Sequence, residues 1–200
     1  MPAVAAPTEP PARPAVLAPI PGIRDRLKQA TAEAHRDLDG RLGALGLGRL
    51  QDYRQFLEIS AAALLPLEAA LEAAGVAAIF TDWPWRSRRA AIAADLARVG
   101  GSLRRLEDQP ALNRNAVFGA LYVLEGSRLG AKYLLRTVTL STDPAISLAT
   151  AYLGHGAGQH FWQSFVHALE HAPFTPDDEA EMIAGAHLAF SMFARSAERA

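Results

Sequence analysis

The spacing of apolar residues along this chain is helical from Ile23 onward. Hydrophobic positions recur every three or four residues, and no segment alternates between apolar and polar residues as a half-buried strand does. Alanine-rich segments are separated by glycine and proline, which interrupt helices. The pattern predicts an all-α protein with helices over residues 23–42, 50–74, 86–107, 113–138, 144–171 and 176–198. The fifth helix has a candidate break between Gly154 and Gly158.

Three of these helices begin with recognisable signals. Asp143 and Thr175 each stand before a proline, so an oxygen-bearing side chain can cap the helix while proline occupies its first position. The third helix opens with the basic segment WPWRSRR. We expect this cluster to be a solvated helix start, and a docking patch for a partner is the alternative.

Residues 1–22 differ from the rest of the chain in composition. They hold seven of its 13 prolines and lack the basic segment followed by an apolar one that marks a secretory signal. A chain of 200 residues fits a single domain. The sequence therefore predicts a disordered tail over residues 1–22 and one helical domain over residues 23–200. We expect a cytoplasmic protein, with a signal peptide as the less favoured alternative.

Charge and composition narrow the possible partners. The chain has 20 basic and 21 acidic residues, a net charge of -1, which predicts no binding to nucleic acid or to an anionic membrane. No apolar run approaches the roughly 18 residues needed to span a bilayer. Cysteine is absent, which excludes disulfides, thiolate ligands and thiol nucleophiles. Any metal site must use histidine, aspartate, glutamate or tyrosine.

His35 is the first candidate for chemistry. At 100° per residue, the positions within about 80° of it on the helix are mostly apolar: Leu27, Thr31, Leu38 and Leu42. His35 is therefore predicted to face the core, either as a structural, hydrogen-bonded histidine or as a ligand. Lys28 lies about two turns earlier on nearly the same side. It could meet the carboxylates of a planar ligand held by His35, or it is an ordinary solvated lysine.

A second candidate is the helical segment ALYVLEGSRLGAKYLLR, which carries Gly126 and Gly130 in its interior. Each interior glycine costs up to about 1 kcal/mol relative to alanine, so some interaction must offset that cost. The two glycines share a face with Gly119, Tyr122 and Val123. The bare backbone along this face indicates close approach by a neighbouring helix or by a flat ligand.

Together these segments resemble a known family, the bacterial heme oxygenases, including those linked to bacteriophytochromes. LKQATAEAH is similar to the family's proximal-histidine helix, and LYVLEGSRLGA is similar to its glycine-bearing distal helix. YLGHGAGQHFWQSF gives weaker support. The resemblance spans about residues 23–195 and implies a multi-helix bundle with heme between the first helix and the distal helix.

The resemblance also implies roles for particular residues. His35 would be the axial ligand of the heme iron, Lys28 would pair with a propionate, and Gly126 and Gly130 would touch the opposite heme face. The family cleaves heme to biliverdin, CO and ferrous iron with O2 and electrons from a ferredoxin or a reductase. A bacteriophytochrome would be a possible acceptor of the biliverdin.

The distal segment departs from the family pattern at two positions. Ala131 stands where the family often has another glycine, and Ser127 stands where mammalian members have an aspartate, as bacterial relatives can. Ser127 is therefore expected beside the distal face, with the proton route resting on ordered water. Four further residues are candidates for the pocket wall or rim: Thr31, Tyr122, Lys132 and Tyr133.

Other readings of the sequence remain. His167 and His171 have the spacing of metal ligands, but apolar residues occupy the opposite face of their helix, which predicts a solvated stripe. A di-iron carboxylate bundle is excluded because no Glu-x-x-His occurs. A thiaminase-like hydrolase would need a cysteine. A heme carrier or sensor without turnover, and an interaction domain without heme, stay open as alternatives to a monomeric or weakly associating enzyme.

Overall fold

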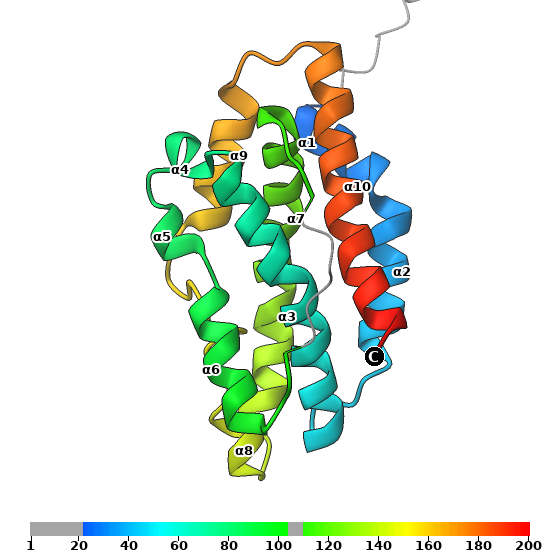
Figure 1. Cartoon of the computed structure of the whole chain (residues 1–200), viewed down its shortest axis with the longest axis vertical. Coiled ribbons are helices and arrows are strands. Elements are labelled where there is room, and N and C mark those ends of the chain that lie inside the picture. Colours follow the sequence, from blue (N-terminus) through cyan, green and yellow to red (C-terminus); the bar gives the residue numbers. More distant parts are fainter. Residues whose placement is uncertain (1–21, 104–109) are drawn as a thin grey trace, which may run out of the picture.

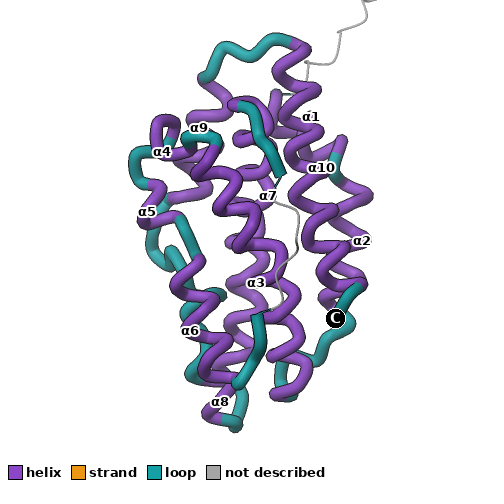
Figure 2. Tube along the Cα trace, viewed as in Figure 1, coloured by secondary structure: helices purple, strands orange, loops and turns teal. Residues whose placement is uncertain are grey.

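The computed structural model describes residues 22–103 and 110–200, and every regular element in these ranges is a helix (Figures 1 and 2). The predicted all-α class is thus confirmed. The helices are α1 (Ile23–Ala30), α2 (Ala32–Gly43), α3 (Leu50–Ala73), α4 (Val76–Ile79), α5 (Trp83–Arg86), α6 (Arg89–Val99), α7 (Arg114–Thr139), α8 (Pro144–Ser147), α9 (Phe161–His171) and α10 (Pro176–Glu198). The predicted tail, apart from Gly22, lies outside the described residues.

Helix α3 forms much of the core. Its sequence is apolar around most of its circumference, which is typical of a helix enclosed by others. It packs against α6 and α10. Thirteen of its residues are buried: Tyr53, Phe56, Leu57, Ile59, Ser60, Ala61, Ala62, Ala63, Leu64, Leu67, Glu68, Ala70 and Leu71. Each large apolar side chain among them contributes about 1.5–3 kcal/mol through its removal from water.

The most extensive helix contact joins α7 to α10. Two glycines allow the backbones to approach closely. A Cβ at Gly119 would lie 1.9 Å from the carbonyl oxygen of Met182, and a Cβ at Gly185 would lie 2.3 Å from that of Ala116. No side chain fits at either distance, so these two glycines are required by helix packing.

The predicted first helix is divided at Thr31. This residue separates α1 from α2 with φ -101° and ψ 3°, away from the helical values. Its hydroxyl donates to the carbonyl oxygen of Leu27 at 2.8 Å. Such a bond to the preceding turn bends helices, which explains why periodicity alone did not reveal the division.

The predicted helix over residues 86–107 is also wrong in its extent. Ser87 adopts an extended conformation, with ψ 132°, between α5 and α6. Helix α6 ends at Gly100, whose φ of 65° is left-handed. The predicted residues 104–107 lie outside the described part.

The predicted helix over residues 144–171 is broken, as its glycines suggested. Helices α8 and α9 are separated by turns over residues 148–160. Gly156 and Gly158 have φ values of 75° and 80°, which other residues rarely adopt. The break is therefore built into the sequence.

The capping predictions are confirmed. Asp143 accepts a hydrogen bond from the backbone N–H of Ala145 at the start of α8. Thr175 and Asp178 form a reciprocal capping box at the start of α10. Helix α10 therefore begins at the predicted proline and runs over the predicted residues 176–198.

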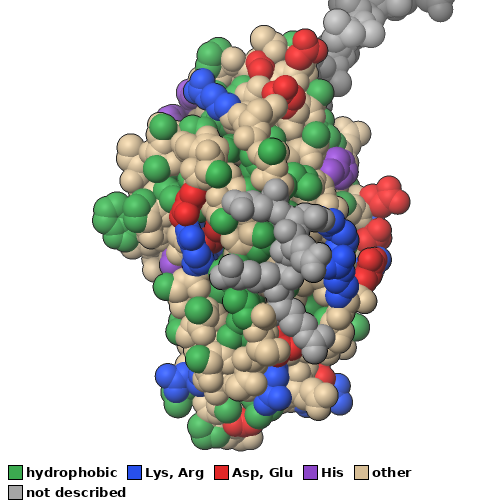
Figure 3. Space-filling model, viewed as in Figure 1, with side chains coloured by type: hydrophobic (Ala, Val, Ile, Leu, Met, Phe, Trp, Pro, Cys, Tyr) green, Lys and Arg blue, Asp and Glu red, His purple; other side chains and the backbone are tan. Residues whose placement is uncertain are grey.

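On the face drawn in Figure 3, acidic and basic side chains are interspersed rather than gathered by sign. This distribution agrees with the net charge of -1. No helix within the described residues is both long and apolar enough to cross a bilayer.

Candidate functional site

His35 does not face the core, so this prediction is wrong. Its side chain is 62% exposed. Helix α2 lies at the surface with no fully buried residue, and Ala34, Leu38 and Leu42 are the positions that pack partly against the core. Helix α2 therefore packs against α10 along a narrow face, and His35 lies beside that face. Its ring meets the ring of Phe190 on α10 edge-on, with centroids 5.8 Å apart.

The imidazole of His35 is oriented by Asp39, one turn later on α2. Nδ1 of His35 lies 2.9 Å from Oδ2 of Asp39. A carboxylate accepts hydrogen bonds, so the proton of a neutral imidazole is on Nδ1 and the lone pair is on Nε2. This arrangement is typical of histidines that bind metal. Sequence reasoning did not single out Asp39, although its i, i+4 spacing from His35 is the signal that could have found it.

Thr31 and Tyr122 connect the first helices to α7. Thr31 is buried at the junction of α1 and α2, and its side chain shares a hydrogen bond with that of Tyr122. Burial raises the pKa of Tyr122, and the hydrogen bond with Thr31 opposes that shift. The ring of Tyr122 also packs against Trp162, at 5.9 Å between centroids. Two of the predicted wall residues are thus in direct contact.

From this contact α2 and α7 run in the same direction down the bundle (Figure 1). His35 follows Thr31 by four residues, and Gly126 follows Tyr122 by four. Each lies about one helical turn, or 5.4 Å along the axis, beyond the contact. Both helices pack on α10. The fold therefore brings the predicted histidine and the first predicted glycine to similar depths along the bundle.

Gly126 and Gly130 are not required by helix packing. A Cβ at Gly130 would lie in open space, and a Cβ at Gly126 would make an ordinary contact of 3.6 Å with the ring of Trp162. Gly119, in contrast, lies against the α10 backbone. The stripe predicted on α7 thus has two parts. Gly119 serves helix packing, whereas Gly126 leaves bare backbone beside the ring of Trp162 and Gly130 leaves bare backbone in open space.

The remaining predicted rim residues are at the surface. Lys28 and Lys132 are exposed, and no hydrogen bond or ion pair engages either of them within the described part. Tyr133 is 80% exposed. Ser127, beside Gly126, is also exposed, and its hydroxyl donates to the carbonyl oxygen of Leu124 at 2.8 Å.

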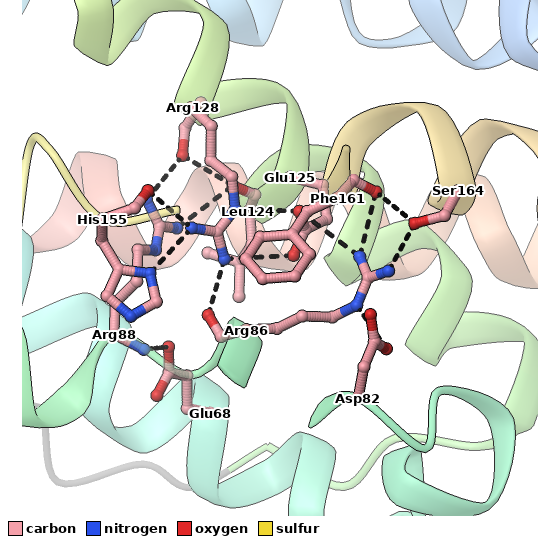
Figure 4. Close-up of polar contacts among 11 residues, drawn as sticks. Glu68, Asp82, Arg86, Arg88, Leu124, Glu125, Arg128, His155, Phe161 and Ser164 are labelled. Carbon is pink, nitrogen blue, oxygen red and sulfur yellow. Dashed lines mark hydrogen bonds and ion pairs between the residues drawn. The ribbon is translucent and has the colours of Figure 1, made fainter. Parts of the chain in front are cut away.

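The basic segment before α6 is not a solvated helix start, and this prediction is wrong. Arg86 is 2% exposed and Arg88 is 3% exposed. Figure 4 shows the guanidinium group of Arg86 turned toward Phe161 and Ser164 at the start of α9. The guanidinium group of Arg88 donates to Leu124 and Ser127 on α7. We refer to Arg86, Arg88 and Arg128, together with the buried Glu125, as the arginine network. Sequence reasoning missed it, although the lone Glu125 within the apolar segment LYVLEG is a signal for a buried charge with partners.

Glu125 is the anionic centre of the arginine network. Its carboxylate lies 2.8 Å from Nε of Arg128 and 3.6 Å from Nη1 of Arg86. Arg128 also donates to the carbonyl oxygen of Arg86 at 2.6 Å. These bonds fasten α7 to the α5–α6 segment, and removing Glu125 would leave the largely buried Arg128 without its counter-charge.

His155, in the turns before α9, belongs to the same region. Its Nδ1 lies 3.1 Å from Nη1 of Arg128, and since arginine only donates, Nδ1 accepts. Burial, together with the positive charges of Arg128 and Arg88, lowers the pKa of His155 to about 4. His155 is therefore neutral at pH 7 and serves as an acceptor for Arg128.

Two cavities in the described part lie away from His35 and the open glycines. One of about 560 Å³ is lined by His155, Trp85 and Phe161 among others. A smaller one of about 310 Å³ lies between the start of α1 and the segment joining α9 to α10. His167 and His171 are exposed, as predicted. No group of three or more metal-ligating side chains occurs among the residues that the structure describes.

Comparisons with known proteins agree on one family. A sequence model of the family described as heme oxygenase matches residues 22–199. A heme oxygenase from Xanthomonas campestris pv. campestris is 30% identical over 156 residues, which cover 75% of this chain and 92% of that protein.

Solved structures give the same result. The NO- and CO-bound heme oxygenase from Neisseria meningitidis superposes with a TM-score of 0.71 at 25% identity, covering 89% of this chain and 91% of that one. Heme oxygenase from Leptospira interrogans shares the fold, with a TM-score of 0.67 at 16% identity over 90% of this chain and all of that one.

Proposed function

Because this chain belongs to the heme oxygenase family, we propose that it cleaves heme to biliverdin, CO and ferrous iron at a site between His35 on α2 and the open glycines of α7. It is an oxygen-dependent oxidoreductase, and heme is both its substrate and its prosthetic group. When bound, heme supplies the iron that activates O2 and the macrocycle that is oxidised. The chain's own residues must hold, orient and protect that group.

His35 fits the role of proximal ligand by its chemistry. Its Nε2 carries the lone pair because Nδ1 bonds to Asp39 at 2.9 Å. The exposed imidazole is accessible to a ligand, and its ring edge is supported by Phe190. Asp39 keeps the imidazole in one tautomer and one orientation. This histidine–aspartate pair is the observation that carries the proposal.

Gly126 and Gly130 fit the role of distal surface. Bare backbone at these two positions lets a flat macrocycle approach, and the open space at Gly130 is where a side chain would stand in the way. Trp162 and Tyr122 extend the wall beyond Gly126 with aromatic surface. The close backbone would confine a small ligand on the distal side and leave room for water.

Lys28, Lys132 and Tyr133 supply candidate partners for the propionates. All three are exposed, and a lysine ammonium or a phenol hydroxyl can donate to a carboxylate. Thr31 closes the site at the junction of α1 and α2. Because the charge-assisted contacts of the two lysines would form at the surface, each contributes modestly.

The partners follow from the reaction. Electrons must come from outside the chain, from a ferredoxin or a reductase. We further propose that the protein is a cytoplasmic monomer or weak dimer, with a bacteriophytochrome as acceptor of the biliverdin. Residues 1–22 are proposed to be a tail outside the heme-binding domain of residues 23–200, which agrees with the family match to residues 22–199.

A hemin titration followed by turnover tests this function. We expect a Soret band that saturates at one heme per chain and then decays to a biliverdin band when ferredoxin, reductase and air are supplied with catalase. A stable Soret band without product would instead support a heme carrier or sensor. No Soret band at all would leave the family's fold without its activity.

A further inference from the structure

Arg88, in the basic segment before α6, contacts the turn of α7 that contains Gly126. One of its terminal nitrogens donates to the carbonyl oxygen of Leu124 at 3.1 Å, and the other donates to Oγ of Ser127 at 3.1 Å. Leu124 and Ser127 enclose Gly126 in the sequence. The planar guanidinium therefore binds one residue before Gly126 and one residue after it.

The only proton of the Ser127 hydroxyl is engaged in this contact. Its single proton is donated to the carbonyl oxygen of Leu124 at 2.8 Å, while its oxygen accepts from Arg88. No proton of this hydroxyl is left for a ligand on the open side of α7. Ser127 thus lies where mammalian relatives carry an aspartate, but its bonds run to the protein.

Arg88 is itself held in place by two further contacts. Its backbone N–H donates to the buried carboxylate of Glu68 at 2.8 Å, and its guanidinium lies over the ring of Tyr152, 5.2 Å from the centroid. The side chain is 3% exposed. Within the described residues no carboxylate forms an ion pair with this guanidinium, whose acceptors are neutral oxygens. Its hydrogen bonds are charge-assisted, and the one to the carbonyl oxygen of Leu124 is buried.

We propose that Arg88 is a positioning residue of the distal surface: it fixes the turn at Gly126 through Leu124 and Ser127, and Ser127 anchors this turn instead of donating a proton to the ligand. This inference rests on the proposed function, because the turn matters to chemistry only if heme lies against it. Glycines make a helix easy to bend. The two hydrogen bonds from Arg88, which we call the clamp, therefore limit bending of α7 at Gly126.

The variant Arg88→Lys tests the clamp, with Arg89→Lys as its matched control. Lysine keeps the charge but lacks the planar fork that reaches two acceptors at once. Arg89 belongs to the same segment, is partly exposed, and pairs with Glu68 and Glu72 rather than α7. We expect R88K to bind hemin within about threefold of the wild-type Kd. Its biliverdin formation should fall about tenfold or more, with a changed ratio of high-spin to low-spin ferric heme.

Ser127→Ala tests the same contact from α7 and serves if R88K does not fold. We expect it to change the spin-state ratio in the direction of R88K and to lower turnover about threefold. In the double variant the two losses should not multiply, because both changes remove one clamp. If the fold-losses in turnover of the two single variants multiplied in the double variant, Ser127 would act on the ligand independently of Arg88, and the inference would be overturned.

The role of Arg88 and the proposed heme oxygenase function would be overturned by different results. R88K that matches R89K in turnover and in spectrum, while wild-type protein produces biliverdin, would overturn the clamp alone. Wild-type protein that gives no Soret band with hemin would overturn the proposed function and the clamp with it.

Discussion

At the scale of single residues, His155 accepts a hydrogen bond from Arg128 and has a lowered pKa. His155 stays neutral in the fold because burial and two nearby guanidinium groups oppose its protonation, with a pKa of about 4. In the unfolded chain an ordinary histidine titrates near 6.5. The unfolded state therefore binds a proton first as the pH falls, and stability is lost between about pH 6.5 and pH 4.

This difference predicts the effect of His155→Asn. The asparagine amide oxygen can still accept from Arg128 but does not titrate. We expect the variant to lose less unfolding free energy than the wild type between pH 7 and pH 4.5, as measured by urea unfolding at each pH. His167→Asn, at an exposed position, is the control and should follow the wild type. Parallel curves for H155N and the wild type would contradict the assigned role.

The sequence singled out candidate residues but did not predict their burial or their partners. The sequence identified His35 and the two glycines, but periodicity could not tell that α2 lies at the surface by an edge and leaves His35 62% exposed. It also could not reveal that Arg86 and Arg88 point inward. The partners of Arg88 on α7 come about 40 residues later in the chain, and those of Arg86 on α7 and α9 come about 40 to 80 residues later. Such long-range pairing leaves no local pattern.

At the scale of elements, α7 carries glycines that serve two different purposes. Gly119 allows contact with the α10 backbone, whereas Gly130 opens onto free space. The sequence placed both on one face and left packing and ligand binding as alternatives. The structure assigns packing to the first and leaves the second for a ligand.

The distinction predicts opposite effects for two identical substitutions. Gly130→Ala should leave the melting temperature of the heme-free protein unchanged or raise it, since alanine favours a helix by up to about 1 kcal/mol. The same variant should lower biliverdin formation about tenfold, because the methyl group stands on the distal surface. Gly119→Ala should instead lower the melting temperature by about 4 °C or more through overpacking.

Calorimetry and turnover of the two variants decide between these purposes. If G130A destabilised the heme-free protein as much as G119A does, Gly130 would be a packing residue. If G130A left turnover unchanged, the open face of α7 would have no part in heme chemistry.

Helix boundaries were predicted where local chemistry sets them. Helix α10 begins at a capping box followed by proline, and both are written in adjacent residues. The division at Thr31 and the extended Ser87 depend on bonds and packing that sequence spacing does not display. Element identity was therefore more predictable than element length.

At the scale of the whole molecule, the bundle places α2 and α7 on a shared neighbour, α10, and joins them through the hydrogen bond of Thr31 with Tyr122. The class of fold could be predicted because helical spacing runs through the chain. The arrangement could not, since it depends on which faces of α3, α7 and α10 meet. The family resemblance implied a multi-helix bundle but not which helix faces pack together.

The proposed domain boundary predicts that a chain starting at Gly22 is sufficient for heme binding. Gly22 is the N-cap residue of α1, and the family match begins there. We expect a variant lacking residues 1–21 to keep its melting temperature and its hemin affinity within about twofold of the full chain. Loss of heme binding on truncation would place part of the site in the tail.

The most direct test of the account is the absorption spectrum of hemin bound to His35→Ala, beside His187→Ala as an exposed-histidine control on α10. We predict that H35A loses the spectrum of imidazole-bound heme, that added imidazole restores it in part, and that turnover falls about 100-fold. The control should match the wild type in both. An unchanged spectrum with unchanged turnover in H35A would show that His35 is not the ligand and that heme, if bound, lies elsewhere in the bundle.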